Sequence, residues 1–281
     1  MLNKASTFDI TDLIFDLDNT TWSFTNMFVK AQRAMVEFLV NESGYPQSVI
    51  ENEIRQVKSN AGTLDYPFVV QNIPILHGPN SMDLAMGSKA VFDGVCAETF
   101  IPYSNVHSTL EEIQQRGINM HVFTDAPLTR AVWRLSAAGL GKYFDNVFVQ
   151  KDPTLQSPYS RALVNMHYHD EYNLATLPNT KPNLDLSRYL HIPQKEIPKR
   201  VGVVGDNWKK DMGLANINGC YGFFAEYGQP TPEELSALSA MSEAEAVSRS
   251  VNMSGGIDII DRSKIEFLRF SIQELLKYLR V

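Results

Sequence analysis

Short apolar runs that end abruptly in polar residues constrain the fold of this chain more than any other feature. The first run, at 13–15, is followed by Asp16 and Asp18. Apolar runs bounded by turn residues predict buried strands. Side chains alternate along a strand, so two aspartates one residue apart project the same way. Two carboxylates at such a short distance repel each other unless a cation neutralises them. An isolated pair is also compatible with a simple acidic turn.

The same pattern recurs later in the chain, which turns isolated motifs into one candidate site. Strands predicted at 119–123 and 201–204 end at Thr124, Asp125 and Asp206. Two further strands are predicted, at 146–149 and 221–224. Helical periodicity separates these runs, and the alternation predicts an α/β fold with a doubly wound parallel sheet. The carboxyl ends of parallel strands share one edge, where ligands bind, so we expect the polar strand ends to meet there.

The block between the first strand and the rest of the sheet has a different pattern. Helical spacing of apolar residues predicts three helices, at 25–43, about 47–59 and about 81–98. Apolar strands are missing from this block. We therefore predict a helical domain at 23–102, inserted into a core formed by 1–22 and 103–281.

Two late helix starts carry capping-box patterns. Thr231 is followed three residues later by Glu234, and Ser271 by Glu274. The second is followed by apolar residues at helical spacing. We therefore predict that one helix begins near 231 and a final helix near 271.

Composition narrows the class of protein. The 281 residues are 44% hydrophobic, enough for a sizeable core, and the net charge of −7 argues against nucleic-acid and anionic-membrane partners. The start of the chain lacks the apolar core of a signal peptide. Cys96 and Cys220 are far apart and are typical of buried, reduced cysteines. We predict a cytoplasmic location.

Four motifs, taken in order, make the chain resemble the haloacid dehalogenase (HAD) superfamily, in particular its phosphatase-like members with a helical, C1-type cap. Residues 16–20 (DLDNT) match the first family motif, Asp-x-Asp-x-Thr/Val, and Thr124 ends an apolar strand as in the second. Lys181 before a proline fits the third motif, and 205–211 (GDNWKKD) matches the fourth. The first and fourth motifs are specific, whereas the second and third would be weak alone. The resemblance spans about 10–220.

The resemblance implies a Rossmann-like core and a magnesium-dependent phosphohydrolase. In that family pattern Asp16 is the nucleophile, which forms an aspartyl phosphate and ligates Mg²⁺. Asp18 is the general acid and base, and its backbone carbonyl is a metal ligand. Asp206 supplies a further metal oxygen. The cap is expected to close over the site and exclude water.

The same resemblance implies that the phosphate is bound by Thr124, Asp125 and Lys181, and that Asp211 orients Lys181 or a water molecule. Each assignment has an alternative. Thr124 could be a helix N-cap, Lys151 could replace Lys181, and Asp211 could be a surface helix residue. Asp125 stands where the family more often has Asn, and its extra negative charge beside a phosphate is unexplained.

A further pair of basic residues, Lys209 and Lys210, is interpreted as a solvated helix face. The cap residues that set specificity are expected around 67–80, without a way to choose among them.

The expected substrate is a small phosphorylated metabolite. Dehalogenases of the superfamily lack the second aspartate of the first motif, so Asp18 favours phosphoryl transfer. The sequence FDLDNT also resembles nucleotidase-like members, which makes a nucleoside monophosphate one candidate. The alternatives are a phosphomutase or phosphotransferase acting on a sugar phosphate and a non-catalytic binding protein that kept the fold. The oligomeric state is left open.

Overall fold

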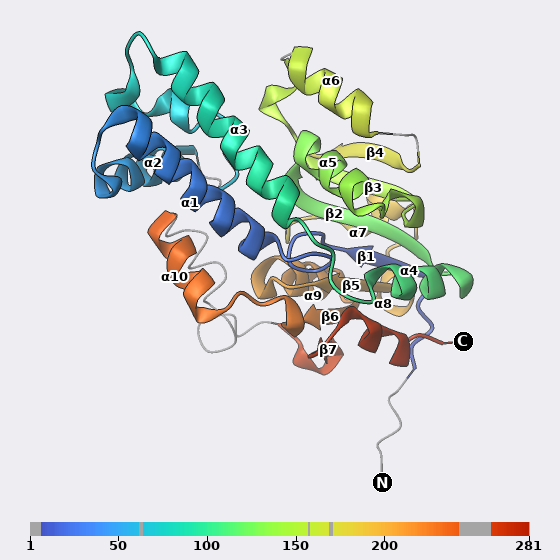
Figure 1. Cartoon of the computed structure of the whole chain (residues 1–281). Coiled ribbons are helices and arrows are strands. Elements are labelled where there is room, and N and C mark those ends of the chain that lie inside the picture. Colours follow the sequence, from blue (N-terminus) through green and yellow to red (C-terminus); the bar gives the residue numbers. More distant parts are fainter. Residues whose placement is uncertain (1–6, 62–63, 157, 169–170, 242–259, 281) are drawn as a thin grey trace. The chain divides into compact units, whose positions relative to one another are not determined.

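The computed structural model describes residues 7–61, 64–156, 158–168, 171–241 and 260–280. The chain divides into two compact units (Figure 1). Within the described residues, the first unit comprises 7–22, 102–229 and 260–280, and the second comprises 23–101 and 230–241.

The first unit is built on a parallel sheet. Its strands are β1 (Asp12–Phe15), β2 (Asn119–Pro127), β3 (Asn146–Gln150), β4 (Asn173–Leu177), β5 (Val201–Gly205), β6 (Tyr221–Ala225) and β7 (Ile265–Leu268). The order is β4-β3-β2-β1-β5-β6-β7, and every neighbouring pair is parallel. β1 lies between β2 and β5, where Phe15 is in register with Val122 and Val204. The first strand is therefore central, and its carboxyl end has a strand end on each side.

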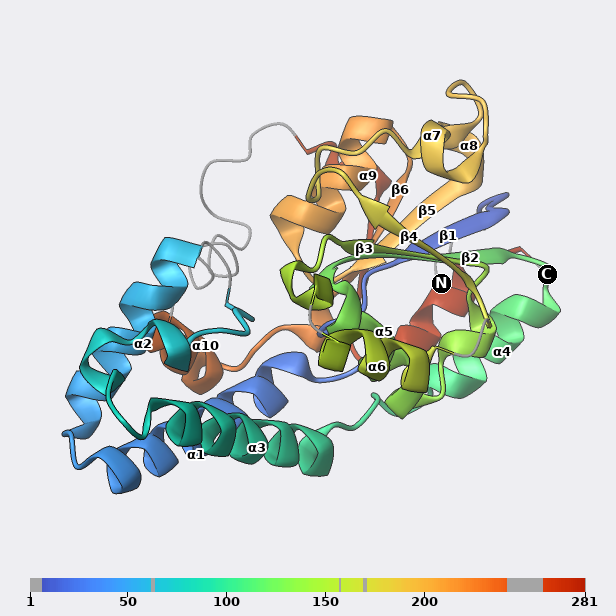
Figure 2. The ribbon, with the colours of Figure 1, turned by 90° about the horizontal axis from the view of Figure 1, so that it is seen from above.

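Helices cover both faces of the sheet, which confirms the doubly wound architecture. They are α4 (Val106–Gln115), α5 (Leu128–Ala138), α6 (Pro158–His167), α7 (Leu186–Leu190), α8 (Ile197–Arg200) and α9 (Gly213–Asn218). Figure 2 shows α4, α5 and α6 on one face and α7, α8 and α9 on the other. The sheet is the centre of the core, with Leu13, Phe15 and Phe123 fully buried.

Two strands of the sheet were not predicted from the sequence. β4 and β7 are its two edge strands, and most of their side chains remain accessible to solvent. An edge strand needs no continuous apolar run, so it leaves a weaker sequence signal than a central parallel strand. The final helix was also predicted wrongly. The chain forms a short 3₁₀ segment, η8 (Ile272–Lys277), and the Ser271 side chain makes no capping bond.

The second unit is helical, as predicted. It contains α1 (Phe24–Ser43), α2 (Gln47–Ala61), α3 (Ser81–Thr99) and α10 (Pro232–Met241), with short 3₁₀ turns η1 (Val70–Asn72) and η2 (Pro74–Leu76). Leu39, Ile50 and Ile73 lie at the centre of its own apolar cluster. At Gly87, an added Cβ would lie 2.4 Å from the Phe38 ring, so the glycine lets α3 pack closely on α1.

Helix α10 packs in this unit, although its residues were predicted to belong to the core. The capping box at its start is confirmed, because the Glu234 N–H donates to Thr231 Oγ1 (3.2 Å) and the Thr231 N–H donates to Glu234 Oε2 (2.9 Å). Asn26 of α1 donates to Glu234 Oε1 (3.0 Å), and Arg55 of α2 donates to the Ala240 carbonyl (2.7 Å). The helix itself was predicted correctly. The unit to which it belongs is decided by its contacts with α1 and α2, which are distant in sequence.

None of the helices in the described part of the chain combines the length and the hydropathy that a membrane span requires.

Candidate active site

The carboxyl ends of the two central strands bring the acidic motifs together. The Asp16 N–H donates to the Val204 carbonyl (2.9 Å), which extends the β1–β5 ladder to the first aspartate. Asp206 follows directly after β5. Carboxylate oxygens of Asp16, Asp206 and Asp211 lie within 4.8 Å of one another, and the three side chains are buried.

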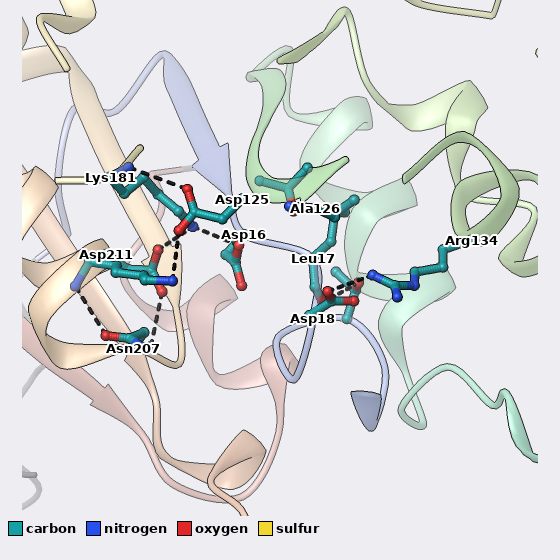
Figure 3. A network of polar contacts seen from close by, with 12 residues as sticks. Asp16, Leu17, Asp18, Asp125, Ala126, Arg134, Lys181, Asn207 and Asp211 are labelled. Atoms are coloured by element: carbon teal, nitrogen blue, oxygen red, sulfur yellow. Dashed lines mark hydrogen bonds and ion pairs between the residues drawn. The ribbon is translucent and has the colours of Figure 1, made fainter. Parts of the chain in front are cut away.

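Lys181 lies in the middle of this acidic cluster. Its Nζ is 2.6 Å from Asp16 Oδ1 and 2.6 Å from Asp211 Oδ1 (Figure 3). The lysine follows β4 in the loop that leads to α7, and its side chain is buried. Lys151, the alternative considered from the sequence, is exposed just after β3. The lysine in contact with Asp16 is therefore Lys181.

Asp211 is held by an unusual local structure. Residues Trp208–Met212 form a π-helical turn (η5), a rare conformation that is frequent at functional sites. The Asn207 N–H donates to Asp211 Oδ2 (2.9 Å), which fixes the carboxylate. Gly205 is required beside it, because an added Cβ would lie 2.3 Å from Asp211 Cγ. Asp211 is thus part of the buried cluster and not a surface helix residue.

The cluster holds more negative than positive charge. Burial raises the pKa of Asp16 well above its usual range; Lys181 opposes this effect, and Asp211 and Asp206 reinforce it. Burial would lower the pKa of Lys181, but Asp16, Asp211 and Asp125 outweigh it and raise the pKa of the ammonium above its ordinary value. One ammonium does not balance the carboxylates.

The carboxylates fit a hard divalent cation. Carboxylate oxygens are the ligands that Mg²⁺ prefers, and an ion of charge +2 would offset the negative charge left beside Lys181. Asp16, Asp206 and Asp211 are close enough for this role. The Asp18 carboxylate is outside this group, which is compatible with the backbone-carbonyl role that the family resemblance implies for Asp18.

Asp125 has a cationic partner that explains its charge. Its Oδ1 accepts from the Lys181 N–H (3.3 Å), and its Oδ2 is 3.0 Å from Lys210 Nζ. Burial would raise the pKa of Asp125, but Lys181 and Lys210 outweigh that effect and hold the pKa below its usual range. Lys209 is exposed, as predicted, whereas the Lys210 side chain is 31% exposed and forms an ion pair with Asp125 that was not predicted.

Thr124 is buried in a strand that continues beyond it. β2 runs to Pro127, with an irregular register against β3 between Phe123 and Pro127. Thr124 Oγ1 accepts from the Ala126 N–H (3.1 Å). The residue that precedes α5 is Pro127, which has no capping side chain, so Thr124 is not the N-cap of that helix.

Asp18 is held by two residues that the sequence analysis missed. Its Oδ1 accepts from Trp22 Nε1 (2.7 Å), and its Oδ2 accepts from Arg134 Nη1 (2.8 Å). In Figure 3 the Asp18 and Arg134 side chains point toward each other. The sequence signal that could have revealed Arg134 is its place on the apolar face of α5, beside Ala131 and Leu135 at helical spacing.

A second missed element supports the loop after β1. The 3₁₀ turn η6 (Glu226–Gly228) packs against this loop, and the Tyr227 hydroxyl donates to the Thr20 carbonyl (2.6 Å). An added Cβ at Gly228 would lie 1.7 Å from the Asn19 carbonyl oxygen. Only a residue without a Cβ allows this approach.

Comparison with known proteins finds a relative in sequence and similar folds among solved structures. No family model matches the chain. The chain is 26% identical over 245 residues to a phosphoglycolate phosphatase of Vibrio parahaemolyticus, an alignment that covers 85% of this chain and 94% of that protein.

Two solved structures share the fold. The HAD phosphatase from Thermococcus onnurineus has a TM-score of 0.57 at 16% identity, covering 97% of this chain and 100% of the other. The magnesium-bound HAD-hydrolase YfnB from Bacillus subtilis has a TM-score of 0.53 at 15% identity, covering 97% and 99%. The chain therefore shares the fold of these two HAD proteins, with its motifs gathered at the carboxyl edge of a parallel sheet.

Proposed function

We propose that this protein is a magnesium-dependent phosphohydrolase that cleaves a small phosphate monoester. The observation that carries the proposal is the buried contact of Lys181 Nζ with Asp16 and Asp211, with Asp206 beside them. This arrangement combines a carboxylate nucleophile, a fixed cation and an acidic set suited to a metal. The similarity to a phosphoglycolate phosphatase supports a phosphate ester as the substrate class.

In this proposal Asp16 attacks the phosphorus atom. A bond forms between a carboxylate oxygen of Asp16 and phosphorus, and the ester bond to the leaving oxygen breaks. Asp18 donates a proton to that oxygen and then accepts one from the water that hydrolyses the aspartyl phosphate. The products are an alcohol and orthophosphate, and both aspartates return to their starting state.

The other residues stabilise charge. Lys181 places an ammonium beside the nucleophile, where it would attract the phosphoryl oxygens, and Thr124 offers a hydroxyl donor. Asp206 and Asp211 would hold Mg²⁺ together with Asp16. When bound, that ion reduces the repulsion between the phosphate and the carboxylate nucleophile. Asp125 would help to hold the phosphate-binding residues in place, because it accepts from the Lys181 N–H and forms an ion pair with Lys210.

The experiment is an orthophosphate-release screen against phosphorylated metabolites, with and without Mg²⁺. The panel contains nucleoside monophosphates, phosphoglycolate, sugar phosphates and an aryl phosphate. We expect Mg²⁺-dependent release from at least one monoester, its loss in Asp16→Asn and Lys181→Met, and its retention in Lys151→Met, the matched exposed lysine. Failure to release orthophosphate from any ester in the panel would refute the proposal.

Two alternative functions have distinct outcomes in the same screen. A phosphomutase would convert a sugar phosphate into an isomer without bulk orthophosphate. A non-catalytic protein would bind a phosphate ester without turning it over. The presence of Asp16, Asp18 and Asp206 argues against the non-catalytic alternative, whereas a phosphomutase would use the same residues and is distinguished by its product alone.

A further inference from the structure

Arg134 is a buried cation in a helix whose inner face is otherwise apolar. It lies on α5, where Ala131, Val132 and Leu135 are fully buried. Arg134 is itself only 3% exposed. Burying a guanidinium is costly unless a carboxylate compensates it, so the position of Arg134 demands an acidic partner. That partner is Asp18, which is 116 residues away in the sequence.

Trp22 completes the environment of the same carboxylate. The loop after β1 folds tightly, because the Leu17 carbonyl accepts from the N–H groups of Thr20 (3.1 Å) and Thr21 (2.8 Å). This turn returns the chain to Asp18, so that Trp22 Nε1 donates to Oδ1 while Arg134 donates to Oδ2. Each carboxylate oxygen is therefore tied to a different, buried element of the first unit.

The chemistry of these partners restricts where Asp18 can act. Indole and guanidinium groups are donors only, so neither can accept a hydrogen bond from a protonated Asp18. A proton carried by Asp18 must therefore point away from both. Two fixed donors also limit rotation of the carboxylate, and catalytic groups held in one orientation lower the cost of reaching the transition state.

We propose that Arg134, supported by Trp22, is a positioning residue that orients the Asp18 carboxylate for proton transfer to the leaving group. This inference rests on the proposed phosphohydrolase function. It predicts an effect that depends on the leaving group. An alkoxide needs a proton to depart, whereas p-nitrophenolate is stable without one, so disorder of Asp18 impairs alkyl esters most.

The test compares Arg134→Met with the wild type on p-nitrophenyl phosphate and on the best alkyl monoester from the screen. We expect kcat/KM for the alkyl ester, which reports the step that expels the leaving group, to fall about 100-fold, the size of one general acid–base contribution, with a much smaller fall for p-nitrophenyl phosphate. Asp18→Asn should show the same selectivity, and Arg134→Lys should recover part of the loss because it keeps a donor and a charge.

Controls separate positioning from simple loss of structure. Arg130→Met, on the same helix, is the matched control and should leave both activities near the wild-type level. Thermal unfolding of every variant reports the fold. If Arg134→Met does not fold, Arg134→Lys and Trp22→Phe provide the same comparison of the two esters.

The outcomes are distinguishable. Equal losses on both esters, or no loss on either, would show that the pair only anchors α5 to the loop and would overturn the inference while leaving the proposed function intact. A wild-type protein that hydrolyses neither ester, nor any other in the panel, would refute the proposed function itself and the inference with it.

Discussion

Lys58, a buried lysine in the helical unit, makes the stability of the protein depend on pH. It lies on α2, is 2% exposed, and its Nζ is 2.7 Å from Gln32 Oε1 and 4.7 Å from the centre of the Phe28 ring. Burial lowers the pKa of Lys58 from its ordinary 10.5 to about 7, with Asp65 opposing part of the effect. Lys58 therefore loses its proton at a much lower pH in the folded chain than in the unfolded chain.

The size and sign of the effect follow from proton linkage. A fall in the pKa of Lys58 from 10.5 to about 7 corresponds to about 5 kcal/mol of destabilisation when the lysine is charged. Between those pH values the unfolded chain binds more protons than the folded one, so the free energy of unfolding rises with pH. The rise approaches about 1.4 kcal/mol per pH unit within the window and amounts to about 2 kcal/mol between pH 7 and pH 9.

The assay is urea unfolding of the wild type and Lys58→Met at pH 7, 8 and 9. The methionine variant should lack the contribution of Lys58 to the pH dependence. At pH 7 it should be more stable by about 1–3 kcal/mol, because removal of the buried charge outweighs the roughly 1–3 kcal/mol cost of leaving the Gln32 carbonyl unpaired. Lys30→Met, which removes an exposed lysine from α1, is the control and should retain the wild-type pH dependence. Identical pH slopes in the wild type and Lys58→Met would refute the reasoning.

Three further predictions concern the candidate site. In Lys181→Met, loss of the buried ammonium leaves the Asp16 and Asp211 carboxylates uncompensated, so unfolding in EDTA should show a loss of about 3–5 kcal/mol at neutral pH, and an unchanged midpoint would contradict the charge balance. Gly205→Ala should displace the Asp211 carboxylate, because its Cβ would lie 2.3 Å from Asp211 Cγ. We expect the Mg²⁺ concentration that gives half-maximal turnover to rise at least tenfold, and an unaltered metal titration would count against that geometry. Lys210→Met should reduce kcat/KM because it leaves Asp125 negative beside the phosphate, and the double variant with Asp125→Asn should recover most of the loss; additive losses would exclude charge compensation.

The strand and helix pattern was largely predictable because it is local. The central strands β1, β2 and β5 carry continuous apolar runs, and such runs are what a parallel strand buried on both faces requires. The edge strands β4 and β7 were missed because their exposed sides relax that requirement. The final helix was predicted from a capping box, but the Ser271 side chain caps nothing, which shows that the pattern alone does not ensure the bonds.

The amino-acid sequence by itself determined which residues stand at the carboxyl ends of the parallel strands. Periodicity and turn chemistry act over a few residues, and topology then places Asp16 and Asp206 at one edge. The same local patterns predicted the α/β class and the helical unit, and the strand ends predicted the acidic character of the site.

Only the tertiary structure decided which partner each charged group has. Lys181 rather than Lys151 contacts Asp16, and Asp18 is tied to Arg134. Asp125 is neutralised by Lys210. These pairs join residues that are mostly far apart in sequence, and burial forces each charge to find a complement that no local pattern specifies. Pairing of buried charges is therefore a property of the packed molecule, and it converts an acidic strand edge into a site with distinct proposed roles for its aspartates.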